Sequence, residues 1–92
     1  MTLAELRAKI DTIDEQIVRL LHARASVAVE VGTLKKQTGQ PIFDAQREEQ
    51  VFEKVTSPSL GSVLPPESVK SIYKTIIASA HAVEQRVQDS AS

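Results

Sequence analysis

Cysteine is absent from the 92-residue sequence, which excludes disulfide bonds and thiolate chemistry. There are only two histidines, His22 and His81, and their spacing is unlike that of metal ligands, which argues against a metal site. The formal net charge is −1 and no basic patch is interleaved with aromatic residues, so nothing favours nucleic-acid binding. No basic region followed by an apolar core opens the chain, and no apolar run approaches the roughly 20 residues of a membrane span. We therefore expect a cytoplasmic protein without nucleic-acid or membrane partners.

The main feature of the sequence is a pattern typical of one long helix over residues 2–36. The composition, 41% apolar and 25% charged, is that of a single soluble domain over residues 1–92. A helix of this length spans about 50 Å, which is too long for the remaining chain, folded once against it, to cover. Its apolar residues alternate at spacings of three and four and form a stripe, the seam, made up of Leu3, Leu6, Ile10, Ile13, Ile17, Leu20, Val27, Val31 and Leu34. We therefore expect an oligomer in which the seam faces a partner helix.

Arg24 stands where the next apolar member of the seam is due. Burying a guanidinium between two helices is energetically costly unless it binds an anionic partner there, so Arg24 is a candidate functional residue. Lys35 lies three turns, roughly 16 Å, further along the same side, whereas Arg7 is about 25 Å before Arg24. No small ligand spans that second distance. If the three cations serve one site, Arg7 should reach it from another chain packed antiparallel to this one.

The ends of this helix carry their own signals. Thr2 and Glu5 have the spacing of a capping box at its start, and Gly39 followed by Pro41 predicts its end. Gly32 lies inside the helix, where glycine costs about 1 kcal/mol relative to alanine. It indicates the close approach of another backbone or of a ligand, or else a tolerated glycine.

A second helix is predicted to begin at the N-cap Asp44 and to run to residue 55. Its apolar residues recur every three or four positions, and the same spacing continued toward the N-terminus places Asp44, Arg47 and Glu48 on the helix face that points to the core. These three residues fit a binding site, and they also fit an exposed ion pair with a helix cap.

A third helix is predicted after a loop at residues 56–66, because two prolines precede Glu67. Glu84 borders the apolar stripe of this helix, either as a solvated residue or as part of a site. Residues 88–92 are polar and terminal, which predicts a frayed end.

Taken together, these features resemble the all-α chorismate mutases over nearly the whole chain. The similarity is carried by residues 6–11, by residues 27–32 with Lys35 after them, by residues 41–49, and by two isoleucines before Glu84. The resemblance implies an intertwined helical homodimer. Each chain would have three helices, a long first, a short second and a medium third. An arginine from the partner's first helix, here Arg7, would complete each of the two sites.

The activity implied by the resemblance is the rearrangement of chorismate to prephenate, without cofactor, metal or covalent intermediate. A dicarboxylate substrate would be frozen in a compact shape while fixed charges stabilise the negative charge on its breaking ether oxygen. Lys35, Glu84 and Arg24 would be catalytic. The resemblance implies that Arg24, Arg47 and the partner's Arg7 bind the substrate carboxylates. Lys35 and Glu84 would contact the ether oxygen. Asp44 and Glu48 would bind the ring hydroxyl or orient their neighbours.

The chain departs from the bacterial pattern at two positions, with Ala80 in place of a serine and Glu84 in place of a glutamine. A glutamate can donate to the ether oxygen only when it is protonated. The same scaffold would suit an isochorismate-pyruvate lyase or an aminodeoxychorismate mutase, where a carboxylate would pair with a substrate amine. It would also suit a mutase domain of the kind fused to other shikimate-pathway enzymes. A non-catalytic helical dimerisation module would explain the seam but not Arg24 within it.

Overall fold

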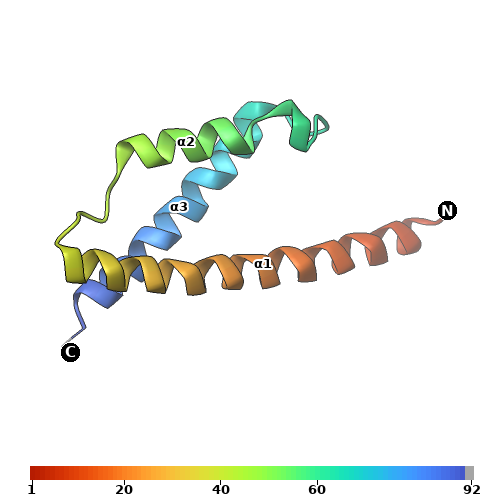
Figure 1. Ribbon diagram of the computed structural model, residues 1–92. Coiled ribbons are helices and arrows are strands. Elements are labelled where there is room, and N and C mark those ends of the chain that lie inside the picture. The colour runs from red at the N-terminus through yellow and green to blue at the C-terminus, as the bar shows by residue number, and fades with distance from the viewer. Residues whose placement is uncertain (91–92) are drawn as a thin grey trace.

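The computed structural model describes residues 1–90 and contains three α-helices with one short 3-10 helix. In order along the chain these are α1 (Leu3–Thr38), α2 (Ala45–Val55), η1 (Pro58–Leu60) and α3 (Pro66–Gln88). In Figure 1, α1 runs along the bottom, α2 along the top, and α3 crosses diagonally between them. The described chain has no strand, so the predicted all-α class with three helices is confirmed. The end of the predicted frayed segment, residues 91–92, lies outside the described residues.

Both ends of α1 are capped as the sequence predicts. The Thr2 hydroxyl accepts from the Glu5 backbone N–H at 3.1 Å, and the Glu5 carboxylate accepts from the Thr2 backbone N–H at 3.2 Å. At the other end Gly39 is left-handed, with φ 77°, and its N–H donates to the Lys35 carbonyl at 2.8 Å. The helix extends to Thr38, two residues further than predicted, because Gly39 itself is the cap.

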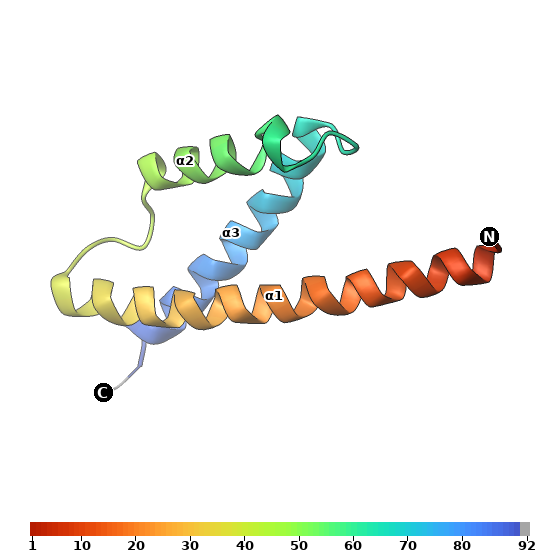
Figure 2. The same cartoon turned by 45° about the vertical axis from the view of Figure 1, so that its right-hand side comes forward.

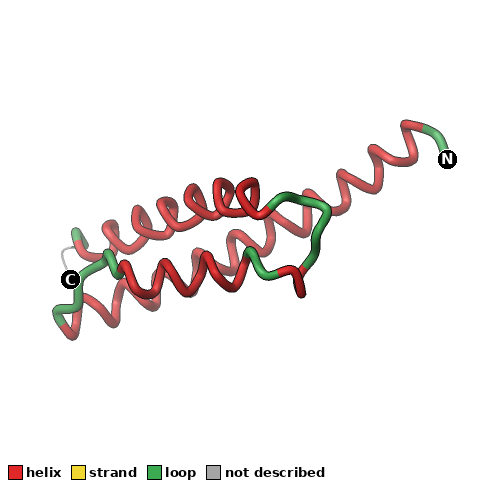
Figure 3. The backbone as a smooth tube through the Cα atoms, turned by 90° about the horizontal axis from the view of Figure 1, so that it is seen from above, coloured by secondary structure: helices red, strands yellow, loops and turns green. Residues whose placement is uncertain are grey.

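The N-terminal half of α1 projects beyond the other helices, as Figures 2 and 3 show from two further directions. α3 packs only against the C-terminal half, where it buries Ala28 and Gly32. The seam lies beside this contact and remains uncovered, with exposed fractions from 39% at Val31 to 69% at Leu20. The expectation that the rest of the chain cannot cover the seam is therefore confirmed for the described residues.

α2 and α3 begin where the sequence predicts. Asp44 caps α2 by accepting from the Arg47 backbone N–H at 3.0 Å, and Pro65 and Pro66 open α3. The predicted loop between them contains η1, which was not expected. It forms because the Ser57 hydroxyl accepts from the Ser59 backbone N–H while a proline occupies the first turn. Among the described residues, no helix is both long and apolar enough to cross a membrane.

Candidate active site

A cavity of about 350 Å³ lies between the C-terminal half of α1, the first turns of α2 and the C-terminal half of α3. Apolar side chains such as Val31, Val51 and Ile77 form part of its wall. Six of the seven predicted site residues line it, three of them cations and three carboxylates: Arg24, Lys35, Arg47, Asp44, Glu48 and Glu84. Of the alternative reading, an exposed ion pair with a helix cap, the structure shows the Asp44 cap, whereas Glu48 is half-buried in this cavity with its Oε2 atom close to the His81 imidazole.

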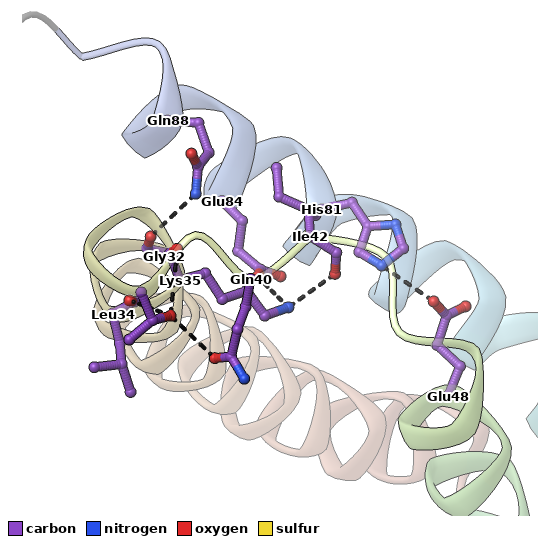
Figure 4. A network of polar contacts seen from close by, with 10 residues as sticks. Gly32, Leu34, Lys35, Gln40, Ile42, Glu48, His81, Glu84 and Gln88 are labelled. Carbon is purple, nitrogen blue, oxygen red and sulfur yellow. Dashed lines mark hydrogen bonds and ion pairs between the residues drawn. The ribbon is translucent and has the colours of Figure 1, made fainter.

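Lys35 is the best-held cation of the cavity. Its ammonium group donates to the Ile42 carbonyl at 2.8 Å and lies 2.8 Å from Glu84 Oε1 (Figure 4). Only 18% of its side chain is exposed. A carbonyl from the α1–α2 connection and a carboxylate from α3 thus fix one lysine in the last turn of α1, which gives the cavity a positive charge in a defined place.

Glu84 is buried, with 5% of the residue exposed. Gly32 makes this burial possible, because a Cβ placed on Gly32 would lie 3.1 Å from the Glu84 Cα and 3.3 Å from the Val87 Cβ. Gln88 adds a link between the helices by donating to the Gly32 carbonyl at 3.4 Å. The solvated alternative for Glu84 is therefore wrong, and Gly32 marks the close approach of a backbone.

The Glu84 carboxylate is not fully satisfied by its neighbours. Its Oε1 atom is buried, and its contact with Lys35 has the distance of an ion pair but not the alignment of a hydrogen bond. A buried carboxylate oxygen normally accepts aligned hydrogen bonds. The Lys35–Glu84 contact is therefore close, and Glu84 Oε1 still lacks an aligned hydrogen-bond partner among the described residues.

Arg24 is half-buried, and its guanidinium lies over the Tyr73 ring, 6.0 Å from the ring centroid. This is within the range of a cation–π contact, so α3 helps to direct the arginine that interrupts the seam. Arg47 and Asp44 are exposed at the mouth of the cavity, where Asp44 already uses one oxygen to cap α2. Ala80 also lines the cavity, so the position of the missing serine lies on its wall.

His81 is a cavity residue that the sequence analysis missed, since it weighed histidine only as a metal ligand. Its Nε2 lies 3.3 Å from Glu48 Oε2, and its ring meets Phe43 edge-on with the centroids 6.2 Å apart. The available signal was its spacing, four residues after Ile77 and three before Glu84, which places all three on one helix face.

Arg7 does not line the cavity. It is exposed and lies in the part of α1 that projects beyond the other helices. One chain therefore forms a cavity that contains every predicted site residue except this arginine, and its arrival from a second chain stays a prediction.

Comparison with known proteins gives one consistent result. The family model for chorismate mutase type II matches residues 6–85. A bifunctional chorismate mutase/prephenate dehydratase of Aquifex aeolicus is 38% identical over 89 residues, which cover 94% of this chain and 25% of that protein. A chorismate mutase of Methanocaldococcus jannaschii is 43% identical over 53 residues, which cover 58% of this chain and 54% of that protein. The chain thus spans between about a quarter and a half of the length of these curated relatives.

A solved structure agrees with the sequence comparisons. The chorismate mutase (form II) of Thermus thermophilus superposes with a TM-score of 0.85 at 29% identity, covering 91% of this chain and 94% of that one. The agreement extends over all three helices, because the match spans nearly the whole of both chains. The chain belongs to the chorismate mutase type II family.

Proposed function

We propose that the protein is a chorismate mutase that converts chorismate to prephenate. The observation that carries this proposal is the convergence of Arg24, Lys35 and Arg47 on one cavity of about 350 Å³. That volume suits a small molecule, and three cations suit a substrate with two carboxylates. The family membership and the match to a solved chorismate mutase support the same activity.

The reaction is an isomerisation, in which the ether C–O bond breaks while a C–C bond forms between the enolpyruvyl arm and the ring. Arg24 and Arg47 would hold the two carboxylates and thereby keep the arm over the ring. Negative charge grows on the ether oxygen as the C–O bond breaks. Lys35, fixed by the Ile42 carbonyl, would stabilise that charge without having to reorganise.

Glu84 would act in its protonated form. As a carboxylate it would repel the ether oxygen and compete for the Lys35 ammonium, from which it lies 2.8 Å in this structure. As a carboxylic acid it donates a hydrogen bond to the ether oxygen and no longer competes for the charge of the Lys35 ammonium. We therefore expect Glu84→Gln, whose amide donates without an added proton, to preserve or raise activity.

The test is the loss of chorismate absorbance on adding purified protein, with the product identified by mass spectrometry. Prephenate, with no pyruvate released, is the expected result. Release of pyruvate from isochorismate would favour the lyase, and turnover of aminodeoxychorismate alone would favour the amino-substituted substrate. A protein that turns over none of the three would contradict the proposal and favour the non-catalytic helical module.

We infer that a second copy of the chain completes each site. The seam is exposed along α1, and the buried apolar residues of the described chain are few, Ala28 and Ile77. So small a core gives a single chain little stability, and a second seam would supply the missing apolar contact.

The numbering of the seam supports an antiparallel pairing. If two copies pair over the whole seam, Leu3 of one lies opposite Leu34 of the other, and Arg7 lies opposite residue 30. That position is between Arg24 and Lys35, the two cations of α1 that line the cavity. Full coverage of the seam and delivery of Arg7 to the partner's site therefore require the same arrangement.

Complementation tests the shared site directly. Arg7→Ala and Lys35→Ala chains are each expected to be nearly inactive. When they are unfolded and refolded together, half of the dimers carry one chain of each kind, and each of these has one intact site, so about a quarter of the wild-type activity should return. A mixture no more active than its parents, or a stable monomer in sedimentation, would contradict the shared site.

A further inference from the structure

The cavity contains one pair of residues, His81 and Glu48, whose contact the proposed mechanism does not use. His81 projects from α3 and Glu48 from the first turns of α2, so the pair connects two walls of the cavity (Figure 4). The Nε2 and Oε2 atoms are 3.3 Å apart, and the side chains are 32% and 22% exposed, respectively.

Glu48 has little else to fix it. Its Oε2 atom is buried and has no aligned hydrogen-bond donor among the described residues, and the polar group that lies close to it is the His81 imidazole. The His81 ring in turn meets the ring of Phe43 edge-on, at an interplanar angle of 79°, although 61% of Phe43 is exposed. The close neighbour that can position the long, flexible Glu48 side chain is thus His81 on the facing helix.

We propose that His81 is a positioning residue that holds Glu48 in the orientation needed to accept a hydrogen bond from the substrate's ring hydroxyl. This inference rests on the proposed function, in which Glu48 binds that hydroxyl. Both the imidazolium and the neutral tautomer protonated at Nε2 donate from the atom that faces Glu48, so the hold does not depend on the charge of the ring. The other charged groups of the cavity are Arg24 and Lys35 from α1, Asp44 and Arg47 from the start of α2, and Glu84 from α3.

The expected signature is a change in KM. The ring hydroxyl neither forms nor breaks a bond in the reaction, so its hydrogen bond is made alike in the ground state and the transition state, and losing its acceptor weakens binding more than it slows the chemical step. His81→Leu should raise KM about tenfold, the factor expected for one charge-assisted hydrogen bond, and change kcat by less than about threefold.

Two variants make this test specific. His81→Gln places a neutral N–H donor close to the original Nε2 and should restore KM to near the wild-type value. His22→Leu is the matched control, because His22 is the other histidine, lies exposed on α1 and does not line this cavity. His81→Leu behaving like His22→Leu, or His81→Gln binding no better than His81→Leu, would overturn the inference while leaving the proposed function intact.

A second measurement needs no turnover. With two histidines in the chain, long-range ¹H–¹⁵N NMR shows two imidazoles, which the two leucine variants assign. Glu48→Ala should shift the Nε2 signal of His81 and leave that of His22 in place. An unchanged His81 signal would contradict the contact between His81 and Glu48. An inactive wild-type protein would instead contradict the proposed function, so the two failures are distinguishable.

Discussion

The two halves of α1 share one apolar repeat but lie in different surroundings. Every residue from 1 to 23 is exposed, whereas the second half contains all the buried and half-buried residues of the helix. The difference comes from a second stripe next to the seam, formed by Ala25, Ala28 and Gly32, whose small side chains let α3 approach. The small residues beside the seam mark the part of α1 that packs within its own chain, and the uncovered seam is the surface that the proposed dimer would use.

Replacing a seam residue in the first half should have the largest effect. In the proposed dimer Ile17 lies near the middle of the seam, and Ile17→Glu would bury a carboxylate there without a partner. We expect monomers in sedimentation and loss of measurable activity, because no partner delivers Arg7. Gln16→Glu, one residue away and off the seam, is the matched control and should remain dimeric. A dimeric, active Ile17→Glu protein would show that the first half has no partner.

In the C-terminal half of α1, replacing the cavity residue Lys35 should greatly reduce the catalytic rate and leave the stability of the fold nearly unchanged. Lys35→Ala should lower kcat/KM by a factor of about 100 or more, equivalent to roughly 3 kcal/mol of transition-state stabilisation. Lys36→Ala is the control, since Lys36 donates to the carbonyls of Val87 and Ser90 and does not line the cavity. Steady-state kinetics and thermal unfolding separate the two effects, and near-normal kcat for Lys35→Ala would contradict its role.

The same separation applies to Arg24. Arg24→Leu restores the apolar repeat of the seam, so its free energy of unfolding should fall little or rise, although its activity is lost. Circular dichroism melts of the variant and the wild type test this expectation. A protein that no longer folds would mean that Arg24 is structural.

Replacing Glu84 by glutamine tests its role as a donor. An ionised carboxylate cannot donate to the ether oxygen, whereas a glutamine amide can. Glu84→Gln should therefore preserve or raise kcat, and Glu84→Ala should be poor, as measured by steady-state kinetics. A Glu84→Gln protein as poor as Glu84→Ala would leave the ether contact to Lys35 alone.

Gly32→Ala should have the smallest effect on stability and a selective one on activity. The new Cβ would lie 3.1 Å from the Glu84 Cα, so α3 must move by a few tenths of an ångström and carry Glu84 with it. The gain of about 1 kcal/mol in helix propensity offsets overpacking of similar size, and we expect activity to fall about tenfold with little change in Tm.

Gly39→Ala gives the opposite pattern and serves as its control. Gly39 has φ 77° and nothing within 4 Å of its missing Cβ, so alanine there lowers stability by backbone strain while Glu84 stays in place. Equal losses of activity in the two variants, per folded molecule, would contradict a positioning role for Gly32.

Local rules predicted the helix ends well, because the caps at Thr2, Gly39 and Asp44 depend on neighbouring residues alone. The spacing along α1 and α2, together with the family resemblance, also predicted six charged residues that the structure places around one cavity, and their roles there stay predictions. The sequence did not reveal that His81 would meet Glu48, or that Tyr73 would lie under Arg24. Both contacts depend on the rotation of α3 relative to the other helices, which is set by packing at Gly32 rather than by any local pattern.

The contact between the Lys35 ammonium and the Ile42 carbonyl has a consequence for protein engineering. Three hydrogen bonds hold the connection from Gly39 to Asp44. At its start the Gly39 N–H donates to the Lys35 carbonyl, and in its middle the Lys35 ammonium donates to the Ile42 carbonyl. At its end the Asp44 carboxylate accepts from the Arg47 N–H and caps α2. These contacts set the length of the connection, so a residue inserted between Gly39 and Pro41, away from the cavity residues Ile42 and Asp44, should lower the proposed activity. The connection around η1 has no such tie to the cavity, and its Val63 is 98% exposed. Affinity tags or whole domains are best inserted there.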